Sequence, residues 1–222
     1  MVGIKPKGKV KLEWSPNFAY AIGLLASDGC LLNDGRHIDL TSKDTEQLEN
    51  FLHALNVDVR ITAKHSGAGK KYQRVQFGDV LFCNFLLDIG FTPAKSKTIG
   101  ELGIPKKYFF DFLRGSFDGD GCFYSYFDPR WRSSFMFYTV FISASKKHID
   151  WLQREIEERL NIKGHITKDG KGSTFQLKYA KAESLELLPK MYYDNRAIYL
   201  LRKYQKIQKA LKIEKKNNAQ VV

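Results

Sequence analysis

The sequence lacks the features that mark membrane-spanning and disulfide-rich proteins. It contains no run of about 20 apolar residues, the length that a membrane-spanning helix needs. Its first residues, MVGIKPKGKVKLEW, lack the apolar segment of a secretory signal. Only three cysteines occur in 222 residues, at positions 30, 83 and 122. This odd, scattered set argues against a disulfide framework and a structural zinc site, and it fits a reducing compartment.

Acidic residues are also scarce relative to basic ones. The chain has 24 Asp and Glu against 36 Lys and Arg, so its net charge is +12. Such an excess predicts a polyanionic partner, nucleic acid first and an anionic membrane surface second, with ordinary solubility as the alternative explanation. Because 43% of the residues are hydrophobic, the chain can still build a packed core.

Familiar catalytic patterns are missing as well: no histidine ligand spacing, glycine-rich phosphate loop, Ser-His-Asp pattern or Cys-x-x-Cys pair stands out. What the sequence does contain is an internal repeat. Aligning AIGLLASDGC (21–30) with LRGSFDGDGC (113–122) places Asp28 over Asp120 and Gly23 over Gly115, 92 positions apart.

The repeat continues downstream with a growing offset. TSKDTEQLENFLHALNV (41–57) resembles SASKKHIDWLQREIEERLNI (143–162), and the growth indicates an insertion, which we expect to be a loop at DPRWRSS (128–134). We predict a duplicated α/β unit, with halves at residues 10–100 and 101–216 and the boundary near 98–106.

Each half has the same expected order of elements. A helix opens at Ser15-Pro16 or at Ile104-Pro105, where proline suits the first turn. A strand, a helix, two strands and a closing helix follow. The expected strands are 36–42, 59–65 and 72–79, then 135–143, 163–169 and 174–180; the expected second helices are 43–55 and 146–160.

Alternation in the later strands predicts a polar sheet face in both halves. A two-stranded ribbon fits a DNA major groove, where Arg, Lys and Gln can contact base edges; for a single strand, an ordinary solvated face is the simpler explanation. The residues that we assign to DNA binding are Arg60, Thr62, Lys64, Arg74, Gln76, Lys95, Lys97, Arg130, Arg132, Thr174, Gln176 and Lys178.

Small residues four apart predict that the two repeated helices touch. Gly23 with Ser27, and Gly115 with Gly119, each make a small helix face. Close packing would set the helix ends side by side and bring Asp28 near Asp120.

Two acids at the negative ends of helix dipoles repel each other, and a divalent cation relieves that repulsion. We therefore predict that Asp28 and Asp120 bind Mg²⁺, aided by the backbone carbonyls of Ser27 and Gly119. Metal ions at such a site can support phosphodiester cleavage. Mn²⁺ is an alternative ion, and Ca²⁺ is a substitute that would bind without supporting that cleavage. Lys43 and Lys146, at equivalent strand-to-helix junctions, are candidates to neutralise a phosphate or position a water.

The repeated segments AIGLLASDG (21–29) and LRGSFDGDG (113–121) resemble two copies of the LAGLIDADG motif. The chain is similar to single-chain LAGLIDADG homing endonucleases over about residues 14–210. Two further segments, TPAKSKTIGELGIP (92–105) and YYDNRAIYLLRKYQKI (192–207), also look like segments of that family.

The resemblance implies an α+β fold of two pseudo-symmetric αββαββα units, with the motif helices packed at the centre and two antiparallel sheets forming a DNA-binding saddle. It implies a monomeric, metal-dependent enzyme that cuts both strands of a long double-stranded DNA site and leaves 3′ overhangs. Its metal-binding acids correspond to Asp28 and Asp120, and its active-site basic residues correspond by position to Lys43 and Lys146. The adjacent polar positions are Ser42 and Ser145, where the family has Gln or Asn.

Three other functions fit parts of the sequence. A DNA-binding regulator without catalytic activity would be expected to lose one or both acids, and both are present. An RNA maturase that assists intron splicing would use the same fold and charge, so that role stays open. A membrane-surface protein is disfavoured because no strongly amphipathic basic helix occurs outside the tail, residues 202–216. No splicing signature lies at either end, so we expect a free-standing or intron-encoded enzyme, cytoplasmic and nucleoid-associated or in an organelle.

The positive charge makes a testable prediction about DNA binding. Affinity for duplex DNA should fall steeply between low and moderate salt, because each phosphate contact releases counterions. A salt titration of binding would check this, and a flat profile would contradict a nucleic-acid partner.

Overall fold

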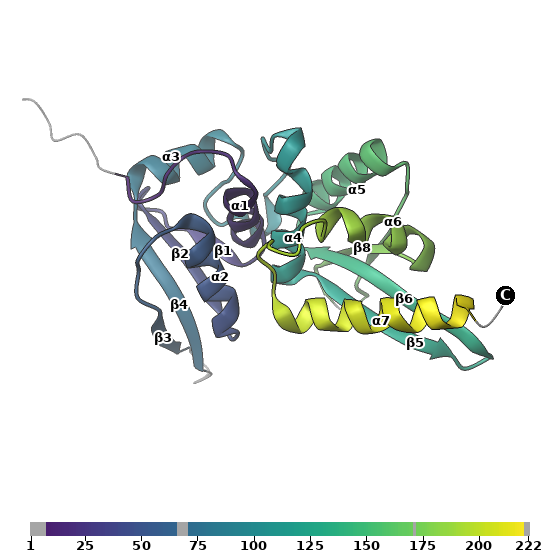
Figure 1. Cartoon of the computed structure of the whole chain (residues 1–222). Helices are drawn as coiled ribbons and strands as arrows, with labels where there is room; N and C mark the ends of the chain where they lie inside the picture. The colour runs from purple at the N-terminus through teal and green to yellow at the C-terminus, as the bar shows by residue number, and fades with distance from the viewer. Residues whose placement is uncertain (1–7, 66–70, 171, 220–222) are drawn as a thin grey trace, which may run out of the picture.

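The computed structural model describes residues 8–65, 71–170 and 172–219, which form an α+β fold (Figure 1). In chain order the elements are α1 (Pro16–Asp28), β1 (Gly29–Leu31), β2 (His37–Ser42), α2 (Thr45–Leu55), β3 (Thr62–His65), β4 (Lys71–Gly78), α3 (Val80–Asp88), the 3₁₀ turns η1 (Lys95–Lys97) and η2 (Lys106–Tyr108), α4 (Phe109–Asp120), β5 (Cys122–Asp128), β6 (Trp131–Ser143), α5 (Lys146–Leu160), β7 (His165–Lys168), β8 (Phe175–Tyr179), α6 (Lys181–Met191) and α7 (Leu201–Ala219).

Two four-stranded sheets repeat one topology. The strand orders are β1-β2-β4-β3 and β5-β6-β8-β7, and all neighbouring strands are antiparallel. The paired helices α1 and α4 lie at the centre, with one sheet on each side (Figure 1). The predicted architecture is therefore confirmed. Within the described residues, no helix combines the length and apolarity needed to cross a membrane.

The two central helices begin differently. Ser15 caps α1 by accepting a hydrogen bond from the amide of Phe18, and Pro16 fills the first turn, as predicted. In the second half, Pro105 precedes the 3₁₀ turn η2, and α4 begins only at Phe109. The predicted start at 104–105 is thus four residues early, because a 3₁₀ turn intervenes before regular α-helix.

Glycine allows α1 and α4 to meet backbone to backbone. A methyl group at Gly23 would overlap the carbonyl oxygen of Phe112 and lie 2.6 Å from the amide nitrogen of Ser116. A methyl group at Gly115 would overlap the carbonyl oxygen of Tyr20. These obstacles are backbone atoms, which cannot rotate away as a flexible side chain can. The close approach predicted from the small-residue faces is present.

A buried carboxylate also joins the two halves. Asp118 of α4 accepts hydrogen bonds from the Tyr20 hydroxyl of α1 (2.8 Å) and from the amide of Leu200, just before α7 (2.7 Å). Burial raises the pKa of Asp118 to about 6, while these hydrogen bonds oppose the rise. Asp118 therefore fixes the path of the chain into α7.

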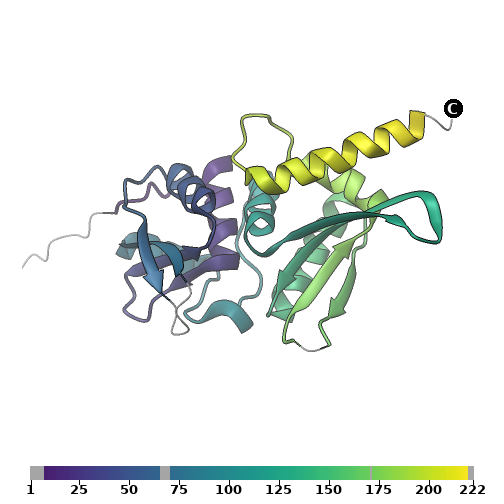
Figure 2. The same ribbon diagram turned by 90° about the horizontal axis from the view of Figure 1, so that it is seen from below.

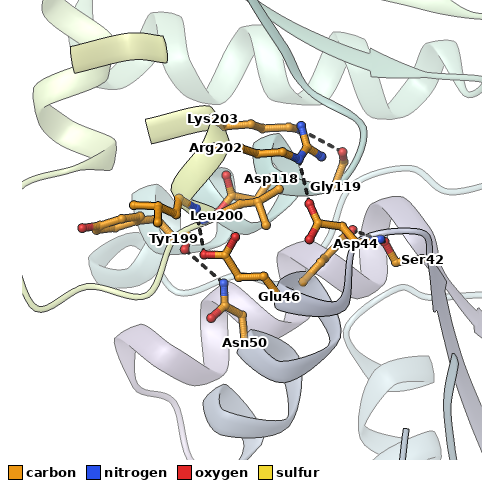
Figure 3. Close-up of polar contacts among 12 residues, drawn as sticks. Ser42, Asp44, Glu46, Asn50, Asp118, Gly119, Tyr199, Leu200, Arg202 and Lys203 are labelled. Carbon is orange, nitrogen blue, oxygen red and sulfur yellow. Dashed lines mark hydrogen bonds and ion pairs between the residues drawn. The ribbon is translucent and has the colours of Figure 1, made fainter. Parts of the chain in front are cut away.

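The start of α7 is held between the halves, although α7 follows the second sheet in the chain (Figure 3). Helix α2 of the first half supplies the partners. The contacts are Asn50 Nδ2 to Tyr199 O at 3.0 Å, Leu201 N to Glu46 Oε1 at 2.9 Å, and Arg202 Nε to Asp44 Oδ2 at 2.7 Å. These bonds fix where the next residue of α7, Lys203, enters the centre of the molecule.

The predicted loop at 128–134 is wrong for most of its length. Trp131 already pairs with Asp128 across a two-residue turn, so β5 and β6 form a long ribbon. Two of its cross-strand pairs, Tyr124 with Tyr138 and Phe127 with Phe135, are aromatic, and such pairs favour sheet structure over loop. The strand predicted over 59–65 also differs, since β3 begins only at Thr62.

The crossing of α1 and α4 makes a stability prediction. We expect Gly23→Ala and Gly115→Ala each to lower the free energy of unfolding by about 2 kcal/mol or more, because the added methyl group meets backbone. Alanine favours a helix by about 1 kcal/mol over glycine, so a gain in stability would contradict the contact. Urea unfolding would measure both variants. Gly100→Ala is the control, because a methyl group there meets open space.

Candidate active site at the paired helix ends

Asp28 and Asp120 are the last residues of α1 and α4. The helix crossing sets their ends together, and a methyl group at Gly119 would lie 3.1 Å from Oδ2 of Asp28. Both strands that follow, β1 and β5, leave the helix ends immediately, at Gly29 and Cys122. The two acids therefore lie at one place, where both halves and both sheets meet.

Burial and mutual repulsion make these carboxylates hard to ionise. Burial raises the pKa of Asp28, while the hydrogen bond from Gln47 Nε2 to its Oδ2, at 2.6 Å, opposes the rise. Burial, and then the charge of Asp28, raise the pKa of Asp120 to about 6. The repulsion expected from the sequence is thus present, on top of a larger desolvation effect.

Two buried lysines occupy the same place. Lys95 Nζ donates to the carbonyl oxygens of Ala26 (2.8 Å) and Ser27 (3.0 Å) at the end of α1. Lys203 Nζ donates to the carbonyl oxygens of Phe117 (2.6 Å), Gly119 (2.9 Å) and Gly121 (2.6 Å) at the end of α4. A cation at a helix C-terminus interacts favourably with the dipole.

The positive charges of Lys95 and Lys203 offset the negative charges of the acids. Burial lowers the pKa of both Lys95 and Lys203 to about 8, and the charges of Asp28 and Asp120 oppose that fall. The centre therefore holds two carboxylates and two ammonium groups, one of each associated with either helix end. The carbonyls of Ser27 and Gly119, predicted as metal ligands, each already accept a hydrogen bond from a lysine.

Lys95 corrects one prediction from the sequence. It was assigned to the DNA-binding surface, but only 4% of it is exposed, and its ammonium group faces the helix ends. The exposed lysine of the same 3₁₀ turn is Lys97.

Lys43 and Lys146, the basic residues predicted for the active site, make other contacts. Lys43 lies over the ring of Tyr72, 5.4 Å from its centroid, and Lys146 binds Asp150 at 2.6 Å. Neither is recorded in contact with an acid of the centre within the described part of the chain. Lys95 and Lys203 are the lysines that the structure brings there.

A sequence signal for these lysines exists. Residues 95 and 203 are 108 positions apart, which continues the growth of the repeat offset beyond 92 at the acids. Each lies in one of the two family-like segments, 92–105 and 192–207. Extending the repeat alignment into those segments would have paired them.

The two acids are supported unequally. Ser42 Oγ donates to Gln47 Oε1 (2.7 Å), and Gln47 in turn donates to Asp28, so a chain of hydrogen bonds orients that carboxylate. The corresponding Ser145 instead donates to the carbonyl oxygen of Ile99 and anchors the linker between the halves. A cavity of about 160 Å³ opens beside Asp120, and Lys95 and Thr174 are among its lining residues.

Most residues assigned to DNA binding lie on or beside the sheets. Thr62, Lys64, Arg74 and Gln76 share one face of the first sheet, where Lys64 and Arg74 both reach Asp39 (3.4 and 3.6 Å). In the second sheet, Gln176 and Lys178 share a face of β8, while Thr174 precedes the strand. Arg60 and Lys97 are exposed outside the strands, Arg130 pairs with Asp128 at the ribbon turn, and the side chain of Arg132 lies outside the described residues.

Solved structures share this architecture. A meganuclease, I-AabMI bound to uncleaved DNA, matches with a TM-score of 0.63 over 93% of this chain and 92% of its own, at 13% identity. The homing endonuclease I-DmoI in complex with DNA and Mn matches at 0.53, over 81% of this chain and 98% of its own, also at 13% identity. The chain has the LAGLIDADG fold.

The LAGLIDADG fold is shared with a second kind of protein. Full-length DUF199/WhiA from Thermatoga maritima matches with a TM-score of 0.57 at 15% identity, over 91% of this chain. The match covers 62% of that protein, so this chain spans less than two thirds of its length. No protein-family model and no curated protein sequence matches the chain. At these identities the LAGLIDADG likeness establishes the fold, and the chemistry has to be argued from the residues.

The cluster of Asp28, Asp120, Lys95 and Lys203 makes a testable prediction about the pKa of Asp120. Lys95→Met should raise the pKa of Asp120 above about 6, because Lys95 is a cation that lowers it. Carbon-13 NMR of the aspartate carboxyl groups, recorded against pH, would measure the change. Lys97→Met is the matched control, since Lys97 is exposed in the same 3₁₀ turn. An Asp120 pKa that is the same in both variants would contradict the arrangement.

Proposed function

We propose that the protein is a site-specific, divalent-metal-dependent endonuclease that cuts double-stranded DNA. The observation that carries the proposal is the pair of acids Asp28 and Asp120, set together with the buried lysines Lys95 and Lys203 at the ends of the two central helices. Titratable groups with strongly shifted pKa values, converging where two halves meet, are typical of a catalytic centre.

The alternative of a regulator without catalytic activity explains less. Burying two ammonium groups beside two partly desolvated carboxylates costs free energy, and apolar residues of similar volume would serve a purely structural centre as well or better. A protein that only binds DNA needs no acid here, since an acid repels phosphate. The retention of both Asp28 and Asp120 therefore favours an enzyme.

The donors at the centre suit a hard divalent cation. Mg²⁺ is commonly held by one or two carboxylates, with water and substrate phosphate oxygens completing its shell. In the described residues no three His, Cys, Asp or Glu side chains form a metal-binding group, so DNA oxygens and water would supply the rest. Asp28 and Asp120 would hold Mg²⁺ or Mn²⁺; when bound, the ion activates water and stabilises the leaving oxygen in phosphodiester hydrolysis.

The remaining residues of the centre have roles that follow from their contacts. Lys95 and Lys203, fixed by backbone carbonyls, would present fixed positive charge to a phosphate that approaches the acids. Gln47 would keep the Asp28 carboxylate in one orientation. These positions are set before the substrate arrives, which reduces the reorganisation that the reaction requires.

The proposed substrate is duplex DNA, bound across both sheets. The net charge of +12, the polar faces around Arg74 and Lys178, and the DNA in the I-AabMI and I-DmoI complexes all support it. Because residues 10–100 and 101–216 each supply one acid, one chain completes the centre, and we propose that the enzyme acts as a monomer.

The proposal predicts how substitutions affect cleavage. With Mg²⁺ and a cleavable duplex recovered from a random DNA pool, Asp28→Asn and Asp120→Asn should each slow cleavage by at least about a hundredfold, because each removes a charge from the centre. Asp88→Asn is the control and should cut like the parent, since Asp88 is exposed at the end of α3, outside the centre. Equal cutting by the parent and by both site variants would overturn the assignment. Binding of a selected duplex that is never cut would favour the regulator.

A further inference from the structure

The β5–β6 ribbon makes the two sheets unequal. The strands β5 and β6 have 7 and 13 residues, whereas the equivalent β1 and β2 have 3 and 6. Figure 2 shows the ribbon projecting beyond the rest of the second sheet, beside the far end of α7. The second half therefore carries an additional surface that has no counterpart in the first half.

One face of this ribbon carries a stack of tyrosines. Tyr124 lies directly across from Tyr138, with ring centroids 5.1 Å apart and planes inclined by 18°. Tyr126 stacks on Tyr138 as well, at 6.4 Å and 7°. Tyr124 and Tyr126 are 39% and 41% exposed. Because the rings pack on one another, their positions are fixed without any partner. We call these three residues the tyrosine stack.

The tyrosine stack lies on the face that starts at the candidate active site. Phe123 is buried in the core, so its neighbours Cys122 and Tyr124 point to the opposite face. Cys122 comes two residues after Asp120, at the end of α4. The same face continues into β8, where Lys178 pairs with Val140 across the strands. The stack is thus continuous with the surface where DNA would lie.

Helix α7 runs along the β5 edge of this face without burying the tyrosines. Its Ile207 and Ala210 are buried, and its Glu214 binds Lys181 at the start of α6, so its main packing is on the helix-covered side of the second sheet. At the edge, Lys206 and Lys209 line one hollow with Tyr124, while Tyr124 and Tyr126 stay exposed.

The corresponding face of the first sheet is chemically different. It carries Asp39, Lys64, Arg74 and Gln76, which are charged or hydrogen-bonding groups. On the ribbon, Met136 pairs with Tyr126 beside the exposed rings of the tyrosine stack. Apart from its three hydroxyls, the tyrosine stack presents apolar ring carbon, which cannot recognise the donor and acceptor patterns of base edges. The thymine methyl is the apolar group that base edges present in the major groove.

We propose that Tyr124, Tyr126 and Tyr138 contact thymine methyl groups in the half of the DNA site bound by the second sheet, while the first sheet contacts its half through charge and hydrogen bonds. This inference rests on the proposed DNA binding and adds the basis of its specificity. The target should be thymine-containing under the ribbon, and thymine should be recognised there by its methyl group.

Replacing thymine by deoxyuridine removes only the methyl group, which gives a direct test. The probe is a duplex selected by binding to the full chain from a random pool, with deoxyuridine then substituted in one half of the site at a time. In the half of the site bound by the second sheet, removing each contacted methyl group should lower affinity about fourfold, which corresponds to one buried apolar carbon. In the half bound by the first sheet, the same replacement should leave the affinity unchanged.

Variants assign the effect to the tyrosine stack. The double variant Tyr124→Ala/Tyr138→Ala should bind the parent duplex more weakly and should no longer respond to deoxyuridine. Lys64→Ala, on the first sheet, should weaken binding but keep the full deoxyuridine response. Thermal unfolding of each variant checks that it is folded.

The outcomes separate the two proposals. If no duplex is enriched, the proposed DNA-binding function fails, and this inference fails with it. If a duplex is enriched but deoxyuridine costs nothing in either half, or costs the same in the double tyrosine variant as in the parent, this inference alone is overturned. Unchanged binding by the double variant would also overturn it.

Discussion

The contact between the backbones of α1 and α4 determines the arrangement of the rest of the molecule. Gly23 and Gly115 have no side chains, so the helices meet at a distance that any other residue would prevent. This approach sets the two helix ends, and with them Asp28 and Asp120, at one point. The sheets diverge from the same point, since β1 and β5 follow the acids directly (Figure 1).

The charges at that point explain the paths of two segments distant in sequence. The two neighbouring carboxylates repel each other, and the surrounding protein partly desolvates each of them. Lys95 reaches the end of α1 from the linker between the halves, and Lys203 reaches the end of α4 from the start of α7. Asp118, Glu46 and Asp44 hold that start of α7 in place (Figure 3). Electrostatic compensation therefore fixes the linker and α7 as much as apolar packing does.

Much of this fold could be predicted from the sequence because its signals are local. The Ser15-Pro16 cap gave the start of α1, and helical spacing of apolar residues gave α5 with its observed bounds, Lys146–Leu160. Duplication added what local signals lack: it singled out Asp28 and Asp120 among many acids.

The errors came where distant segments decide the outcome. Long-range hydrogen bonds bring Lys95 and Lys203 to the helix ends, and the local sequence around each lysine does not indicate that position. Lys43 and Lys146 looked equivalent in sequence, yet their contacts are with Tyr72 and Asp150. Residues 128–134 were predicted as a loop because they are mostly polar and basic, whereas β6 begins at Trp131, which pairs with Asp128.

A single site built by both halves requires that Asp28 and Asp120, one acid from each half, lie at a shared centre. The direct measurement is the pKa of Asp120 in Asp28→Asn, by carbon-13 NMR titration of the carboxyl groups. The charge of Asp28 raises that pKa, so its removal should bring the value down from about 6 toward the ordinary range of an aspartate. An Asp120 titration unchanged by Asp28→Asn would mean that the two acids do not sense each other, and it would contradict a single site built by both halves.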